Sequence, residues 1–112
     1  MKIWLDDVRP APRGYIWCKS VNYAKEIVEM AEGLRDGTKA VFGEEPSKSM
    51  DIEELNLDHD LGDYTKDGGD GIKLLDWLVE RRTFYPIVLH TMNPVGKANM
   101  ERMINAFWNN NN

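Results

Sequence analysis

Three titratable residues stand next to one another in the stretch LDHDLG, which contains Asp58, His59 and Asp60. Carboxylate oxygens bind hard cations such as Mg²⁺ or Mn²⁺, and an imidazole transfers protons near neutral pH. The set therefore predicts one wall of a pocket for a phosphorylated ligand. Asp60 has two interpretations that stay open, which are capping the next turn through backbone amides and orienting a histidine.

Two other parts of the chain carry matching groups. Asp6 and Asp7 follow the apolar run KIWL, and His90, the second of two histidines, follows PIVL. We expect Asp6, Asp7 and Asp58 to hold a metal ion, and His59, His90, Asp58 and Asp7 to be catalytic. Acid/base catalysis requires a group that accepts a proton and a group that donates one, and each positioned proton transfer contributes about 100 to 10,000-fold. Two facing imidazoles would serve both roles, although either histidine alone is equally consistent with a structural role.

Cationic and polar side chains nearby predict phosphate binding. A guanidinium offers a planar fork for two phosphate oxygens, and a helix amino terminus attracts anions. Arg9 is the stronger arginine candidate because it lies two residues after Asp7, although it could instead neutralise the acids. The full set of phosphate-binding candidates is Arg9, Arg13, Thr91, Asn93 and Lys97.

The pattern of apolar residues predicts the elements that position these groups. Short apolar runs predict buried strands over 2–5, 15–18, 53–58 and 86–91, and three amphipathic stripes predict helices. We expect the helices to begin at caps Ser20, Asp70 and Asn93, the first to end at Gly33, and residues 34–50 to form a surface excursion. Alternating strands and helices favour a mostly parallel sheet with helices on both faces. The direction of strand 15–18 stays open, because its connection from the first strand is short.

Composition sets limits on the class of protein. The 112 residues suit one domain, expected over 1–108, with a disordered asparagine tail at 109–112. A net charge of −5 argues against binding duplex DNA or an anionic membrane. The single Cys18 favours a reducing, cytoplasmic location, and neither a signal peptide nor a spanning apolar run is expected. Trp17 or Tyr15 could stack on a base, although packing is the favoured interpretation.

The same residues resemble a response-regulator receiver domain, with an acid pair at Asp6 and Asp7, a phosphoacceptor at Asp58, a glycine at Gly71 and a hydroxyl residue at Thr91. Two features depart from that pattern: VRPAPRG replaces the first helix, and the chain ends before a fifth strand with its lysine. With LDDVRPAP, LDHDLG and HTMNPVG, the chain is more similar to the cyclic-phosphate processing receiver domain family. The resemblance implies a flavodoxin-like, three-layer α/β fold reduced to about four strands.

The resemblance also implies a function. The expected activity is a phosphoesterase that processes cyclic phosphates of nucleotides or RNA ends by acid/base hydrolysis, assisted by Mg²⁺ or Mn²⁺. The expected partner is a small phosphorylated ligand, a cyclic nucleotide or an RNA terminus, and the oligomeric state stays open. Two alternatives remain: a signalling module phosphorylated at Asp58, and a nucleotide-binding protein without catalysis.

Overall fold

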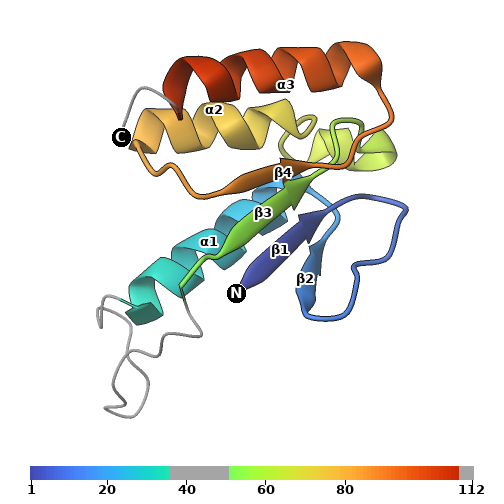
Figure 1. Ribbon diagram of the computed structural model, residues 1–112. Helices are drawn as coiled ribbons and strands as arrows, with labels where there is room; N and C mark the ends of the chain where they lie inside the picture. The colour runs from blue at the N-terminus through green and yellow to red at the C-terminus, as the bar shows by residue number, and fades with distance from the viewer. Residues whose placement is uncertain (36–50, 109–112) are drawn as a thin grey trace.

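The computed structural model describes residues 1–35 and 51–108 (Figure 1). Its four strands form one fully parallel sheet in the order β2-β1-β3-β4, and their bounds are β1 (Lys2–Leu5), β2 (Tyr15–Cys18), β3 (Glu54–Leu57) and β4 (Ile87–Leu89). The predicted α/β receiver-like architecture is therefore confirmed. The direction of β2, which the sequence left open, is parallel to β1.

The connection from β1 to β2 contains no helix. Because β2 is parallel to β1, residues 6–14 must return from the carboxyl end of β1 to the amino end of the sheet, where Lys2 pairs with Tyr15. Pro10 and Pro12 prevent a helix over this return, and Gly14 ends it at a φ of +92°. Figure 1 shows the loop running down beside β2.

The three α-helices follow the predicted stripes, and a short 3₁₀ helix lies between β3 and α2. The bounds are α1 (Val21–Arg35), η2 (Gly62–Lys66), α2 (Ile72–Arg81) and α3 (Pro94–Phe107). Asn93 caps α3 as predicted, since its side chain accepts a bond from the Gly96 amide. Two predictions were wrong: Gly33 lies inside α1, and α2 is capped at Gly71 without a side-chain bond, because the Asp70 carboxylate accepts the Leu61 amide instead.

All three helices form one layer. The β2-to-β3 and β3-to-β4 crossovers progress in the same direction across the sheet, so right-handed connections bring their helices to the same face. Arg81 of α2 is paired with Glu32 of α1, and α3 packs along the other side of α2. The prediction of helices on both faces, in three layers, is therefore not met by the described residues. The physical reason is the loop at 6–14, which occupies the chain position of the helix that would cover the second face.

The two faces of the sheet differ accordingly. Ile3, Leu5, Leu55 and Leu57 point toward the helices and are fully buried. The remaining members of the fully buried core are Cys18, which ends β2, and residues of the helices and their flanks: Val21, Ala24, Val28, Ala31, Leu61, Leu74, Leu75, Leu78 and Met100. The second face carries more polar positions, and Val88 there is 43% exposed. The prediction that the fourth strand is buried was wrong for this reason.

Two sequence predictions cannot be compared with the fold. Most of the surface excursion, residues 36–50, and the asparagine tail, residues 109–112, lie outside the described residues. Among the helices that are described, none combines the length and the apolar character needed to cross a bilayer.

Candidate functional site

A pocket of about 520 Å³ lies at the carboxyl ends of β1, β3 and β4. Ligands of open α/β sheets bind at this edge. The lining residues are Asp6, Asp7, Val8, Arg9, Asp58, Asp60, Thr91, Met92, Asn93 and Pro94. The predicted convergence of the three strand ends is therefore confirmed, and the pocket combines four carboxylates, one guanidinium and the amino terminus of α3.

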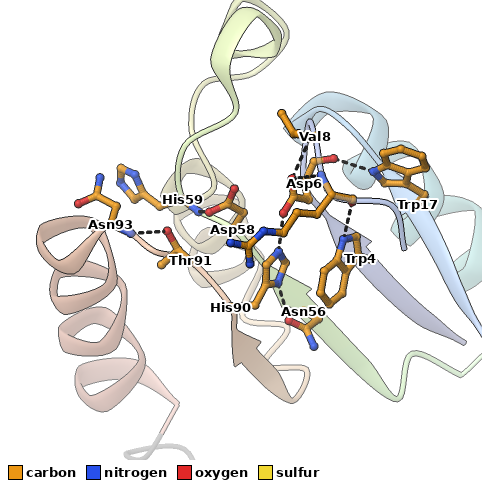
Figure 2. Close-up of polar contacts among 11 residues, drawn as sticks. Trp4, Asp6, Val8, Trp17, Asn56, Asp58, His59, His90, Thr91 and Asn93 are labelled. Carbon is orange, nitrogen blue, oxygen red and sulfur yellow. Dashed lines mark hydrogen bonds and ion pairs between the residues drawn. The ribbon is translucent and has the colours of Figure 1, made fainter. Parts of the chain in front are cut away.

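Asp6 is the most buried of these carboxylates, with 2% of its surface exposed. Its Oδ1 accepts the amides of Val8 and Arg9 at 2.9 and 2.8 Å, and its Oδ2 lies 2.9 Å from Nε2 of His90. Both oxygens are thus engaged (Figure 2). Asp6 shapes the turn that carries Asp7 and Arg9 into the pocket.

His90 is held on the open face of the sheet. Its Nδ1 lies 2.7 Å from Oδ1 of Asn56, and its ring is stacked on Trp4 with a centroid distance of 3.8 Å and an angle of 4°. Both ring nitrogens therefore lie within hydrogen-bond distance of a side-chain oxygen. His90 is therefore held in place by Asp6, Asn56 and Trp4.

His59 lies on the helix side of the same edge. Its Nδ1 is 2.8 Å from Oδ1 of Asp60, and its ring packs against α3 so closely that a Cβ at Gly96 would lie 2.5 Å from the imidazole. In Figure 2 its ring points toward Asn93, whereas the ring of His90 lies beneath Asp6. The prediction that the two imidazoles face one another across a cleft was wrong, because each is paired with a different aspartate.

Asp60 joins the helix side of the pocket. Besides His59, it accepts the side-chain amide of Asn93 at 3.1 Å through both oxygens. The bond with His59, and next that with Asn93, hold the pKa of Asp60 below its usual value. Among the described residues no backbone amide donates to this carboxylate, so the orienting interpretation of Asp60 is the one supported.

Asp7 and Asp58 are the two carboxylates that still have an oxygen available to bind a ligand or a cation in the pocket. Burial is the main reason that the pKa of Asp7 is raised, and the charges of Asp6, Asp58 and Asp60 add to the rise. Asp58 accepts the amide of His59 at 2.8 Å through one oxygen. A cation between these carboxylates would relieve the repulsion that Asp7 experiences.

Several phosphate-binding candidates lie at the pocket and two do not. Arg9, Thr91 and Asn93 line it, and no ion pair joins the guanidinium of Arg9 to a described carboxylate. Arg13 is exposed near the start of β2, at the amino end of the sheet, because the loop has descended there. Lys97 is exposed on α3, where its amino group pairs with Glu101 at 3.9 Å. Arg13 and Lys97 are therefore not part of the pocket.

The sequence analysis missed three residues that position the site. Trp4 and Asn56 hold His90, and Gly96 provides the space for His59. Asn56 carries the clearest signal, because it is a polar residue between Leu55 and Leu57 within a buried strand. An amide at that position, on the face opposite the leucines, needs a polar partner.

The carboxyl edge of this parallel sheet therefore carries an acid pair, a central aspartate and a hydroxyl residue. The family model of the cyclic-phosphate processing receiver domain matches residues 1–106. The chain belongs to that family. Neither the curated proteins nor the solved structures contain a match. Membership in the cyclic-phosphate processing receiver family agrees with the receiver-like topology of the sheet.

The donor set of this receiver domain fits a hard divalent cation. Ligand atoms of Asp6, Asp58 and His90 lie within 4.8 Å of one another, and Asp7 lines the same pocket. Asp6 and His90 already bond to one another, which leaves Asp58 as the member of this cluster with an available oxygen. Mg²⁺ is commonly bound by one or two carboxylates together with ligand phosphate oxygens.

Gly71 supports this arrangement through a close backbone contact. A Cβ at Gly71 would lie 1.9 Å from the carbonyl oxygen of Asp58, and the Gly71 amide donates to the carbonyl of His59 at 2.8 Å. We expect Gly71→Ala to lower the free energy of unfolding by about 1–3 kcal/mol through overpacking. Chemical denaturation of the wild-type protein and of the variant measures this difference. Unchanged stability of Gly71→Ala would contradict the contact.

Proposed function

We propose that this receiver domain hydrolyses a cyclic phosphodiester, giving a phosphomonoester. The observation that carries the proposal is the pocket itself, where Asp7, Asp58 and Arg9 line one opening beside the amino terminus of α3. Carboxylates alone would repel a phosphate. A guanidinium, helix amides and a bound cation together make an anionic ligand favourable there.

In this proposal Asp58 would hold Mg²⁺ or Mn²⁺, and Asp7 stays free for proton transfer. The ion would supply Lewis acidity for the phosphate oxygens when it is bound. The chain itself positions the two carboxylates: Asp6 fixes the turn of Asp7, and the close contact with Gly71 fixes the backbone of Asp58.

Asp7 is the proposed general base. Its raised pKa brings the carboxyl group closer to the operating pH, which improves proton transfer. Asp7 takes a proton from the attacking water as the new bond to phosphorus forms. The bond from phosphorus to one ring oxygen breaks, and the proton returns to that leaving oxygen. The overall change is the addition of one water molecule.

The two histidines have different proposed roles. His90 positions Asp6, because its Nε2 is directed at the Asp6 carboxylate. His59 keeps Nε2 without a bond to any described residue, so it is the imidazole available as an alternative proton donor. If His59→Gln keeps the pH dependence of the hydrolysis rate, Asp7 is favoured as the group that transfers the proton. If the fall in rate on one side of the pH optimum disappears, His59 is favoured.

Arg9 is the proposed phosphate-binding residue, and Arg13 is its matched control on the same loop. We expect Arg9→Ala to raise KM at least tenfold, because a charge-assisted bond to phosphate contributes about 1.5–3 kcal/mol. Arg13→Ala should leave KM unchanged, since Arg13 lies outside the pocket. Steady-state kinetics on both variants makes the comparison. Equal effects of the two substitutions would argue against a direct role of Arg9.

The activity is tested with a panel of cyclic nucleotides and RNA ends that carry cyclic phosphates. Each substrate is incubated with the protein in Mg²⁺, in Mn²⁺ and in chelator, and products are separated by chromatography. We expect ring opening with a divalent cation and its loss with chelator. A panel without turnover, combined with tight binding by calorimetry, would instead favour a sequestering protein.

Phosphorylation of Asp58 is the second candidate function. Its carboxylate lies in the pocket at the end of β3, and Thr91 lines the same pocket at the end of β4. Incubation with acetyl phosphate, followed by intact mass measurement, tests for an added phosphoryl group. A stable adduct that Asp58→Asn abolishes would favour the signalling function over hydrolysis.

A further inference from the structure

A second hollow of about 260 Å³ lies beside the acid pocket and has no role in the proposed hydrolysis. It is referred to below as the aromatic hollow. Its lining residues are Trp17, Lys19, Ser20, Tyr23, Tyr64 and Asp67. Tyr23 and Tyr64 expose 45% and 42% of their surfaces, so much of their apolar ring area remains in contact with solvent.

The rings of the aromatic hollow are carried by segments that are bonded together. Asp67, at the end of η2, accepts bonds from Ser20 and Asn22 at 2.6 and 3.1 Å, and its carbonyl accepts the Asn22 amide. These bonds attach η2, which carries Tyr64, to the start of α1, which carries Tyr23. The hollow is therefore preformed, which lowers the entropy cost of binding.

The aromatic hollow and the acid pocket meet at Asp6 and Asp7. The indole of Trp17 donates to the carbonyl of Asp6 at 2.7 Å, and Figure 2 shows Trp17 on the side of Asp6 away from Asp58. Asp7 contacts the start of η2, where a Cβ at Gly62 would lie 2.6 Å from its Oδ2. These two contacts place the aromatic hollow next to the residues that line the acid pocket.

The chemistry of the aromatic hollow suits a planar heterocycle. Aromatic side chains stack on nucleobases without strong sequence preference. The amino group of Lys19 lies 4.6 Å above the Trp17 ring and adds positive charge to the aromatic hollow. We propose that the aromatic hollow binds the nucleobase of a nucleotide ligand, an inference that rests on the proposed function and names nucleotides as its substrate class.

Calorimetry with two probes tests the proposal on the intact chain. The probes are a nucleoside monophosphate and ribose phosphate, which lacks the base. We expect the nucleotide to bind about 5- to 150-fold more tightly, the range for one stacked base. Equal affinity for the two probes would overturn the proposal, and so would failure of both to bind at millimolar concentration.

Two variants at one position locate the effect. Tyr64→Ala should weaken nucleotide binding about tenfold and leave the affinity for ribose phosphate unchanged, whereas Tyr64→Phe should retain the ring and the affinity. Equal losses for both probes in Tyr64→Ala would overturn the proposal. Tyr23→Leu is the second variant, in case Tyr64→Ala alters the fold as judged by circular dichroism.

The failure of this proposal is distinguishable from failure of the proposed function. If no cyclic phosphate is hydrolysed but the nucleotide still binds more tightly than ribose phosphate, the hydrolase proposal fails and the base subsite stands. If nucleoside and base-free cyclic phosphates are hydrolysed with equal kcat/KM, the hydrolase stands and the base subsite fails.

Discussion

Asp58→Asn is expected to lower the rate of cyclic-phosphate hydrolysis by about 100-fold or more. The substitution removes the carboxylate proposed to hold the cation, and loss of several kcal/mol of transition-state stabilisation corresponds to at least two powers of ten. The protein should remain folded, because the amide of Asn can still accept the bond from the His59 amide. Single-turnover kinetics at saturating Mg²⁺ measures the rate directly.

Asp63→Asn is the matched control for this experiment. Asp63 is an exposed carboxylate of η2 that does not line the pocket, so the same chemical change there should leave the rate unchanged. Titration of Mg²⁺ against both variants separates two causes. A weaker metal affinity confined to Asp58→Asn supports the cation site, whereas normal metal binding with lost turnover would contradict it.

His90→Ala is expected to lower the free energy of unfolding by about 3–5 kcal/mol. Removal of the imidazole leaves Oδ2 of Asp6 without its donor in a position that is 2% exposed, and an uncompensated buried charge is costly. The stacking surface of Trp4 is lost as well. Urea denaturation at neutral pH, followed by circular dichroism, gives the difference.

His59→Ala provides the comparison, because the molecule contains two histidine–aspartate pairs of different burial. Asp60 is 61% exposed, so loss of His59 leaves its carboxylate hydrated and the ion pair itself contributes about 1 kcal/mol or less. In the buried pair, His90→Gln should recover part of the stability that His90→Ala loses, because the glutamine amide can still donate to Asp6. A larger destabilisation by His59→Ala than by His90→Ala would contradict this account.

The sequence predicted the strands and the edge at which their polar residues gather. Leu55 and Leu57 alternate with Asn56, and Asp58 follows them directly, so both the strand and the start of the site are visible in one short stretch. The Asn93 cap of α3 was equally clear, because Pro94 stands at the first helical position. These features depend on residues near one another in the chain.

The directions of the two imidazoles could not be predicted in the same way. Side chains alternate between faces with a period of two, so His59 lies on the side of Leu57 and His90 on the side of Val88. The helices cover only the face on which His59 lies, because no helix between β1 and β2 covers the other face. The alternation of side chains within one strand does not reveal which face of the sheet the helices cover. The position of Arg13 followed from the same cause, since a parallel β2 requires the loop to descend to the amino edge.

A line of polar side chains crosses the uncovered face of the sheet. Tyr15 donates to Glu54, Glu54 accepts from Asn56, and Asn56 bonds His90, which holds Asp6. Tyr15 and Glu54 stand at the first residues of their strands, whereas Asp6 follows the last residue of β1. A continuous series of bonds therefore links the amino end of the sheet to the turn at Asp6, so Tyr15→Phe would remove the bond at one end of a line whose other end holds Asp6.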